Sequence, residues 1–535
     1  MCEININNFS LLYPEIKKSF QDAKFIGVDF EFSALNPIVE FSPSIFDSPS
    51  ERYYKLKANI ENVVPLQVGL TAFIFDSKKN SYCGKIYTFY VQPACFQHIH
   101  RNFYFQSSTI NFLKSYNFDF NKFAYSGISF INKDQELELR RKFKNGEIFE
   151  TNCGCRTEIE EFFNREGEVI KSWYEKALPG EFLTVPKVRG DLYYNEETLY
   201  FLQKTLRNRF QNIWTFIKNR EFIVKKVSKD DRDNLEKTDI LEEKLLDSLL
   251  GFSKVIQLLI TLKKPIIGHN FIQDLLLMVN NFEQALPPSY NQFKELIPKL
   301  FPLIFDTRTI SYGLRSQIPE EKQWVDTGLD SIFDYFKNKV GRHIAPNSPA
   351  IEIENQENSY GKKHDAGWDS FCAGYIFIRL AHLNIYDKYP SSKVFVSSEY
   401  IGGLTQYKNK VNLIRCSVPN INFDGPDPVT TRPPYLVIES RKNQAINISQ
   451  VTSLLSSFGF VEIRKMRFAR TKALVAVDNF GNARRILRGL KSNADYRVIQ
   501  YTLLRHSPIA RICLIGGVSL SGALVVWLTH IALKK

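Results

Sequence analysis

Two acidic residues interrupt a buried-strand pattern near the start of the chain. Five of the six residues from Phe25 to Phe30 are apolar or glycine, but Asp29 breaks the run and Glu31 follows two positions later. Side chains alternate along a strand, so both carboxylates are expected on one face, a few ångströms apart. Like charges at that spacing raise each other's pKa unless a cation lies between them, and Mg²⁺ or Mn²⁺ prefers carboxylate oxygens. The pair predicts a divalent-metal site; an edge strand with two solvated acids is the alternative.

Two further acids lie near the starts of predicted helices. Asp274 follows the short strand 265–270, and Asp369 opens a helix five residues after His364. Each has a structural alternative, because acids stabilise helix N-termini and a lone histidine is more often a surface residue. The order of the motifs is more informative than any one of them: strand Asp-x-Glu, then strand–Asp–helix, then His-x₄-Asp. This order favours one shared acidic site.

Strand and helix signals alternate around these residues. The Pro- and Ser-rich, then charged, segment 37–62 is expected to be a loop. The order fits an α/β fold, a mixed sheet with helices on both faces, interrupted by one insertion. Alternation and apolar runs predict strands at 64–75, 85–91, 265–270 and 303–307, and helical spacing predicts helices at 107–116, 245–262, 271–282 and 368–382.

The chain divides into several predicted segments. In the segment 147–244, helices are expected at 158–177 and 195–218, with Lys and Arg interleaved with aromatic residues; nucleic-acid binding and a solvated helix face fit this pattern equally well. Residues 435–501 follow the β-α-β-β-α-β order of an RRM, but the third strand, 472–477, lacks the aromatic residues that stack on RNA bases. We predict an α/β domain in two parts, 1–146 and 245–390, a helical inserted domain at 147–244, a linker at 391–434 and an RRM-like domain at 435–505.

Composition limits the class of protein. The chain has 535 residues, 44% hydrophobic and 24% charged, which are the values of an ordinary globular protein with two to four domains. The formal net charge of +13 suits a polyanionic partner such as RNA or an anionic membrane. Eight cysteines are scattered, and Cys153 and Cys155 are too close together for a zinc knuckle. With no signal peptide, we expect reduced thiols in a cytosolic setting.

The C-terminal run 512–533 contains no Asp, Glu, Lys or Arg. It is as long as the roughly 20 residues that a helix needs to cross a bilayer, and Arg511, Lys534 and Lys535 flank it. A buried helix of a soluble protein is the alternative. We expect a transmembrane tail anchor that leaves the rest of the chain facing the cytosol. Its modest hydrophobicity and basic flanks favour the mitochondrial outer membrane, with the endoplasmic reticulum membrane as the alternative.

The acidic motifs resemble those of the DEDD 3′→5′ exonucleases of the His-containing branch, and most closely those of the poly(A)-specific ribonuclease family. The resemblance covers about residues 1–385 and the RRM-like module. It implies a ribonuclease H-like exonuclease domain with an active 3′→5′ exoribonuclease site. Further stretches similar to the family are 105–113, 117–120, 267–270, 301–303 and 305–307.

By this resemblance Asp29, Glu31, Asp274 and Asp369 match the metal ligands and His364 the general base. Four carboxylates can hold two Mg²⁺ ions about 4 Å apart, one activating water and one steadying the leaving 3′-oxygen. An imidazole with a pKa near ~6.5 can remove the water's proton at neutral pH, which gives a nucleoside 5′-monophosphate as product. Two apolar residues just beyond the first ligands are expected either to contact the terminal base or to pack in the core, Phe32 and Leu35.

Two features separate this chain from the soluble, cap-binding deadenylases: the C-terminal run, and the absence of tryptophan from 435–501. It resembles instead the membrane-anchored members that trim PIWI-bound piRNA precursors at the mitochondrial surface. That resemblance implies a single-stranded RNA 3′ end as substrate, a PIWI–piRNA precursor complex and a Tudor-domain membrane scaffold protein as partners, and by analogy a homodimer. A membrane-bound poly(A) deadenylase of mRNA or small noncoding RNA and a catalytically silent RNA-binding adaptor are the alternatives.

Overall fold

The structure is a computed structural model that describes residues 2–96, 99, 101–149, 156–185, 196–218, 221–343, 345–354, 362–389, 394–466, 469–507 and 512–513. The chain forms two compact units. The large unit comprises Met1–Ser42, Tyr54–Asn412 and Asn422–Pro426, and the small unit comprises Pro43–Tyr53, Leu413–Ile421 and Asp427–Lys535.

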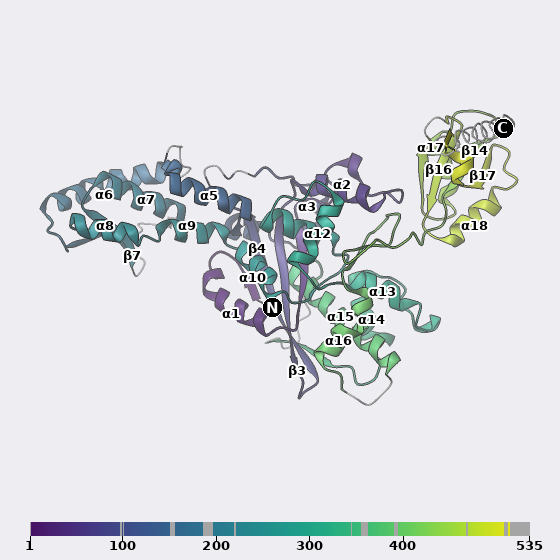
Figure 1. The fold of residues 1–535 in the computed structure, drawn as a ribbon, viewed down its shortest axis with the longest axis horizontal. Helices are drawn as coiled ribbons and strands as arrows, with labels where there is room; N and C mark the ends of the chain where they lie inside the picture. Colours follow the sequence, from purple (N-terminus) through teal and green to yellow (C-terminus); the bar gives the residue numbers. More distant parts are fainter. Residues whose placement is uncertain are drawn as a thin grey trace, which may run out of the picture. The chain divides into compact units, whose positions relative to one another are not determined.

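Eight strands form the central sheet of the large unit (Figure 1). They are β1 (Cys2–Ile4), β2 (Phe25–Phe32), β3 (Pro65–Asp76), β4 (Ser81–Pro93), β5 (Ile128–Phe130), β9 (Ile266–Gly268), β10 (Ile304–Asp306) and β11 (Ala350–Ile353). The order along the main path is β1-β4-β3-β2-β9-β10, and β5 and β11 both pair with β4. Strands β2, β3 and β4 are antiparallel neighbours, whereas β2, β9 and β10 run parallel, so the sheet is mixed, as predicted.

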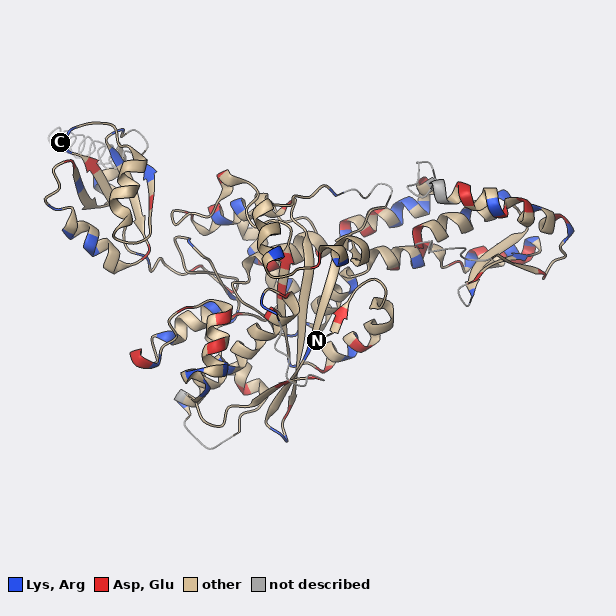
Figure 2. Cartoon of the chain, turned by 180° about the vertical axis from the view of Figure 1, so that it is seen from behind, with Lys and Arg blue, Asp and Glu red and all other residues tan. Residues whose placement is uncertain are grey.

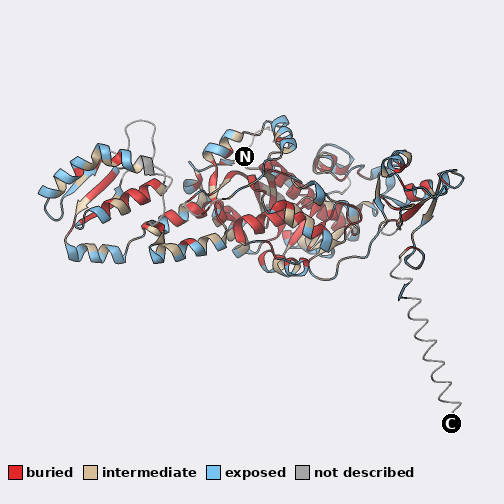
Figure 3. Ribbon diagram, turned by 90° about the horizontal axis from the view of Figure 1, so that it is seen from above, coloured by how far each residue is buried: buried red, intermediate tan, exposed pale blue. Residues whose placement is uncertain are grey.

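The longest helix of the large unit packs directly on this sheet. It is α15 (Ala366–Lys388), which contacts β2, β3, β4 and β9. Apolar residues are spread around this helix, as expected for a helix covered by neighbours, and Phe371, Ile376 and Phe377 are buried in one core cluster. Figure 3 shows burial concentrated in the middle of this unit. Other helices here include α1 (Phe9–Asp22), α2 (Pro49–Ile60), α3 (Ser107–Ser115), α4 (Phe120–Ser126), α5 (Lys133–Asn145), α11 (Ile272–Met278), α12 (Tyr290–Leu300), α13 (Thr307–Arg315), α14 (Leu329–Asn338) and α16 (Ser397–Gly403).

The helix predicted at 245–262 is wrong in one respect: it is two helices, α9 (Leu241–Leu250) and α10 (Ser253–Leu262). The break lies at Gly251, which has a φ of 38°. A Cβ at this position would lie 2.2 Å from the Ser129 carbonyl oxygen, so the close approach of β5 requires glycine. Hydrophobic periodicity does not register such a contact.

The inserted segment 147–244 is not purely helical, contrary to the prediction. Helices α6 (Arg156–Lys176), α7 (Glu196–Arg209) and α8 (Lys229–Lys237) accompany an antiparallel sheet, in the order β6 (Phe182–Val185), β8 (Glu221–Lys226) and β7 (Ile213–Lys218). The helix predicted at 195–218 ends at Arg209, because the β-branched and aromatic residues after it pair with β8. Part of its basic–aromatic pattern is internal: buried Arg207 lies 3.6 Å from the Trp214 ring and 2.6 Å from Asp239.

Two segments expected to be irregular are structured. Helix α2 lies inside 37–62, because Tyr53, Leu56 and Ile60 follow helical spacing and are buried. The linker predicted at 391–434 is wrong for 395–404, where Phe395, Tyr400 and Leu404 belong to the same core cluster as α15. These buried apolar residues are flanked in the sequence by charged and polar residues, so composition alone predicts irregular segments.

The small unit has a four-stranded antiparallel sheet in the order β15 (Val461–Lys465), β16 (Lys472–Val477), β14 (Leu436–Ser440) and β17 (Tyr496–Gln500). Its elements follow the β-α-β-β-α-β order expected for 435–505, with one short helix after them. They are β14 (Leu436–Ser440), α17 (Ile448–Ser456), β15 (Val461–Lys465), β16 (Lys472–Val477), α18 (Phe480–Gly489), β17 (Tyr496–Gln500) and α19 (Leu503–His506). Helix α18 carries three arginines and no acid, seen as blue segments in Figure 2.

Both faces of this sheet are covered. Ala473, Val475 and Val477 on β16 share a core with residues of α17 and α18. Leu474 and Ala476 point to the opposite face, where they pack with Ile45, Phe46 and Tyr435. The carboxylate of Glu462 accepts a hydrogen bond from the Ile45 N–H at 2.8 Å. Segment 43–53 therefore occupies the sheet face that lies away from the helices.

No single helix in the described ranges is both long and apolar enough to cross a bilayer. One pair, Lys229–Leu250 with Ser253–Leu262, meets the length and composition only together and is bent by 83°. The anchor predicted at 512–533 lies outside the described residues, apart from Ile512 and Cys513.

Candidate active site

Asp29 and Glu31 lie on β2, at the centre of the sheet. This strand has β3 on one side and β9 on the other, so the edge-strand alternative is wrong. Both acids are half-buried, and Phe30 between them is 3% exposed and packs on the opposite face. Two carboxylates are thus fixed on one side of a rigid strand.

Two glycines bring the start of α15 against these strands. A Cβ at Gly27 would lie 2.2 Å from the Ser370 carbonyl oxygen, and one at Gly69 would lie 1.8 Å from that of Ala366. Such distances exclude any side chain without a shift of the backbone. Gly69 pairs with Asp29 across β3 and β2, so the same contact carries Asp369 over the first two acids. Sequence reasoning missed both glycines, since glycine in a strand indicates a close approach without naming the partner.

Asp274 lies in the first turn of α11, and a second acid fixes the loop before it. Asp306 is fully buried and its carboxylate accepts hydrogen bonds from the backbone N–H groups of Asn270 (3.0 Å), Phe271 (3.0 Å) and Asn412 (2.9 Å). It also caps α13 by accepting from the Arg308 N–H at 2.9 Å. The sequence did not identify Asp306 as part of the site. An acid placed between a predicted strand and a helix start was the available indication.

His364 stands at the entrance to α15. Its Nδ1 lies 4.0 Å from Asp369 Oδ2, and one ligand atom each from Glu31, His364 and Asp369 lie within 4.8 Å of one another. The next residue, Asp365, caps the helix by accepting from the Trp368 N–H at 3.2 Å, and it also accepts from Thr88 Oγ1 at 3.2 Å. The cap fixes where the helix begins and hence where Asp369 lies.

The electrostatics of Asp29 and Glu31 place Asp274 and Asp369 close to both of them. Burial, and then the carboxylates of Asp369, Asp274 and Glu31, raise the pKa of Asp29 well above its usual range. Burial and the carboxylates of Asp369 and Asp274 do the same to the pKa of Glu31. Burial raises the pKa of Asp369 as well, and raises the pKa of Asp274 to about 8. Burial lowers the pKa of His364, which favours the neutral imidazole.

The residues present fit a bound divalent cation. Asp369 Oδ1 is buried and has no hydrogen-bond partner among the residues that the structure describes. An unpaired carboxylate oxygen beside other carboxylates is costly in the absence of a cation. A donor set of oxygens with one imidazole is that of Mg²⁺ or Mn²⁺.

Phe32 and Leu35 follow the acidic strand. Phe32 ends β2 and is half-buried, whereas Leu35 is 47% exposed. The Leu35 N–H donates to Gln106 Oε1 at 3.0 Å, and its carbonyl accepts from Gln273 Nε2 at 3.4 Å, one residue before Asp274. These two bonds fix the backbone of Leu35, and the contact of its exposed side chain with substrate stays a prediction.

Comparison with known proteins assigns the family. The model of the CAF1 family ribonucleases matches residues 4–377. The "Pre-piRNA 3′-exonuclease trimmer" of Bombyx mori is 32% identical over 538 residues, covering 100% of this chain and 99% of that protein. The "Poly(A)-specific ribonuclease PNLDC1" of Mus musculus is 29% identical over 95% of each chain. The solved structure of S. pombe Pop2p superposes with a TM-score of 0.33 at 14% identity over 73% of this chain and 95% of that one, too low to argue from. On the sequence matches, the chain belongs to the CAF1 family of ribonucleases.

Proposed function

We propose that this ribonuclease is a metal-dependent 3′→5′ exoribonuclease that trims the 3′ ends of PIWI-bound piRNA precursors. The observation that carries the catalytic part is the approach of Glu31, Asp369 and His364 to within 4.8 Å of one another, with Asp274 and Asp369 close enough to raise the pKa of Asp29. The substrate part is supported by the full-length similarity to a pre-piRNA 3′-exonuclease of Bombyx mori. Each cycle releases a nucleoside 5′-monophosphate.

The four carboxylates would hold the metal, most simply two Mg²⁺ ions, with Mn²⁺ as a substitute. When bound, the ions supply charge stabilisation for the phosphoryl group and the leaving 3′-oxygen. The neutral imidazole of His364 takes the proton of the attacking water at physiological pH. Asp306 and Asp365 act indirectly, by fixing the loop before α11 and the start of α15.

Substrate access is proposed along the exposed side of Leu35. Its side chain projects at the end of the strand that carries Asp29 and Glu31, where an apolar group can stack on the terminal base. Phe32, the last residue of that strand, is half-buried and is the second residue expected to contact the base. This arrangement reads the end of a single strand and is indifferent to the identity of the base.

The small unit is proposed to be an RRM-like module that does not stack RNA bases on its sheet. The face that stacks bases in RNA-binding RRMs is packed against Ile45 and Phe46, and β16 has no aromatic residue. RNA contacts by this unit would then be limited to phosphates.

We also propose that the run 512–533 anchors the protein in the mitochondrial outer membrane, facing the cytosol, with the endoplasmic reticulum membrane as the alternative. Its composition supports this location. An anchored enzyme meets RNA presented at the same membrane at a raised effective concentration. A Tudor-domain scaffold carrying the PIWI complex is the partner this arrangement suits, and a homodimer is a further expectation.

A poly(A) deadenylase is the second candidate, because the similar mouse protein is named a poly(A)-specific ribonuclease. Digestion of oligo(A) and of a mixed-sequence oligomer of the same length separates the two activities. A trimming enzyme degrades both at similar rates, whereas a deadenylase strongly prefers oligo(A). Asp29→Asn is the control: release of nucleotides by wild type and variant at equal rates would support the silent-adaptor alternative.

Sequencing of small-RNA 3′ ends in germ cells with and without the protein tests the substrate. Uniformly longer PIWI-bound RNAs on removal are expected. Unchanged lengths with stabilised poly(A) tails would overturn the trimming assignment and favour deadenylation.

A further inference from the structure

The imidazole of His364 is contacted by aromatic rings, not fixed by hydrogen bonds. The ring centroid of Tyr116 lies 4.1 Å from that of the imidazole, and the centroid of Phe112 lies 4.7 Å away, edge to face at 71°. Neither ring nitrogen has a hydrogen-bond partner among the described residues, and the 4.0 Å contact with Asp369 is longer than a hydrogen bond. A histidine that moves a proton is usually oriented by a hydrogen bond to its second nitrogen. In this structure the rings of Tyr116 and Phe112 contact the imidazole, and they take the orienting role that such a hydrogen bond would have.

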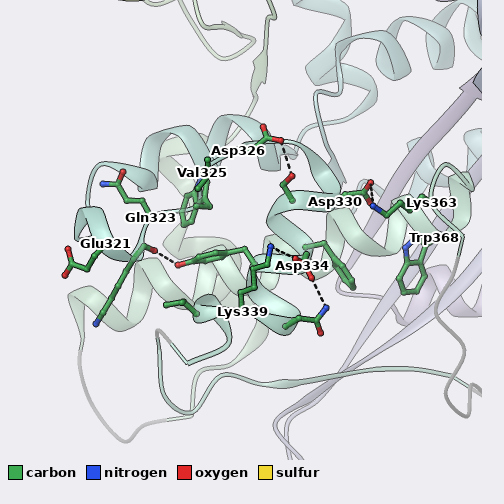
Figure 4. A pocket seen from close by; sticks show the side chains of 16 residues that line it. Glu321, Gln323, Val325, Asp326, Asp330, Asp334, Lys339, Lys363 and Trp368 are labelled. Atoms are coloured by element: carbon green, nitrogen blue, oxygen red, sulfur yellow. Dashed lines mark hydrogen bonds and ion pairs between the residues drawn. The ribbon is translucent and has the colours of Figure 1, made fainter. Parts of the chain in front are cut away.

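The backbone of His364 is in an uncommon conformation. Its φ is 56°, in the left-handed region that a residue with a side chain adopts only when its surroundings impose it. On one side the loop borders a pocket of about 610 Å³ lined by Asp330, Lys363 and Trp368 (Figure 4). The support on that side is the ion pair between Lys363 Nζ and Asp330 Oδ2, at 3.2 Å, between partly exposed side chains.

Helix α3 supplies the support on the other side. Phe112 and Tyr116 are four residues apart, so they share one face of the helix, with ring centroids 5.0 Å apart. The helix end is fixed because buried Leu113 accepts hydrogen bonds at its carbonyl from the N–H groups of Tyr116 (3.1 Å) and Phe118 (3.0 Å).

The other end of α3 is tied to the acidic strand. The Gln106 N–H donates to the Ser33 carbonyl at 3.0 Å, and Gln106 Oε1 accepts from the Leu35 N–H at 3.0 Å. Ser33 follows Glu31 by two residues. One rigid helix therefore connects the strand that carries Asp29 and Glu31 to the ring of His364, which comes from a distant part of the chain.

The two rings are partly exposed. Phe112 is 43% exposed and Tyr116 is 36% exposed, and a leucine at either position keeps part of the apolar area that the ring buries. We propose that Phe112 and Tyr116 are positioning residues that hold the imidazole of His364 at the acidic cluster. This inference depends on the proposed role of His364 as general base and specifies what keeps that base in place.

Loss of a ring should lower the rate of the chemical step without weakening RNA binding. A misplacement of about 1 Å can cost on the order of 100-fold in rate, and general-base catalysis contributes roughly 100- to 10,000-fold. We expect Tyr116→Leu and Phe112→Leu each to lower kcat by about 10- to 100-fold with KM unchanged. Tyr116→Phe keeps the ring and should retain wild-type kcat.

The test uses the full chain in detergent with single-stranded RNA and Mg²⁺. Three quantities are measured for each variant: kcat and KM, the thermal midpoint, and the rate at which diethyl pyrocarbonate acylates His364 without RNA or metal, read by peptide mass spectrometry. The acylation rate of His364 should rise at least threefold in the leucine variants and stay unchanged in Tyr116→Phe. Tyr125→Leu is the control, because Tyr125 is also an exposed tyrosine, 84% exposed.

Several results would overturn the inference. One is wild-type kcat and acylation in both leucine variants. Another is a loss confined to KM, which would assign the rings to contact with RNA bases. A third is a loss of kcat in Tyr116→Phe equal to that in Tyr116→Leu. If His364→Gln keeps wild-type activity, the general-base role in the proposed function fails, while the acylation rates still report whether the rings hold the imidazole.

Discussion

The Asp274→Asn substitution tests whether burial of this carboxyl without metal lowers the stability of the fold. Asp274 is 8% exposed, and burial raises the pKa of its carboxyl from 3.8 to about 8. At pH 7 the Asp274 carboxyl is ionised in the unfolded chain, whereas its raised pKa disfavours ionisation in the folded chain. At about 1.4 kcal/mol per pH unit between about pH 4 and pH 7, this difference in ionisation costs at most about 4 kcal/mol of folding stability.

The sign follows from the direction of the shift. Because the folded-state pKa is raised, the group's favourable contribution is complete below about pH 4 and is lost as the pH rises toward 8. Asparagine has no such titration. In EDTA at pH 7 the Asp274→Asn variant should therefore be more stable than wild type by up to about 4 kcal/mol, and the difference should vanish near pH 4. With Mg²⁺ the order should reverse, since only wild type retains the full ligand set.

Urea unfolding followed by tryptophan fluorescence measures this difference, because Trp324 and Trp368 lie in the core around α15. Asp306→Asn is the matched control: Asp306 accepts several backbone N–H groups, so its loss should destabilise the fold with and without Mg²⁺. The reasoning is refuted if Asp274→Asn is no more stable than wild type in EDTA at pH 7.

Three further outcomes are expected. Gly69→Ala places a Cβ 1.8 Å from the Ala366 carbonyl oxygen, so it should lower the free energy of unfolding by roughly 1–3 kcal/mol and remove most of the activity. Gly402→Ala is the control, because Gly402 has open space around it and the substitution should leave thermal unfolding unchanged. The affinity for Mg²⁺, measured by calorimetry, should rise from pH 6 to pH 8, and binding should release protons. The reason is that the ions must displace protons from carboxyls whose pKa is raised, and an affinity independent of pH contradicts it. Leu35→Ala should raise KM and leave the thermal midpoint unchanged, since Leu35 is 47% exposed; a lower midpoint would indicate core packing instead.

The acidic motifs could be predicted from the sequence because their signals are local. Asp29 and Glu31 interrupt a strand pattern, and Asp274 and Asp369 stand at strand–helix and loop–helix junctions. Alternating elements also indicated a mixed sheet, and the order of elements in the small unit followed from the same periodicity. Their roles in catalysis stay predictions.

What the sequence did not reveal depends on contacts between distant residues. The approach of Gly69 to Ala366 joins a strand and a helix nearly 300 positions apart, and nothing local to either names the other. The same holds for Phe112 and Tyr116, which have the spacing of any amphipathic helix until His364 is placed beside them. The inserted sheet was missed because β7 lies within the helix predicted at 195–218, and its pairing with β8 is a contact that the sequence does not name.

The raised carboxyl pKa values also bear on how this basic chain binds RNA. A formal net charge of +13 attracts a polyanion, but ionised carboxylates at the site repel the phosphodiester that must enter it. A cation that does not support cleavage, such as Ca²⁺, should therefore tighten RNA binding about tenfold or more over EDTA at pH 8 and equal ionic strength. Because the pKa values of these carboxyls are raised, more of them are protonated at pH 5.5 than at pH 8, so the gain should shrink. Fluorescence anisotropy measures both, and equal affinity in Ca²⁺ and EDTA at pH 8 would show that the RNA does not approach these acids.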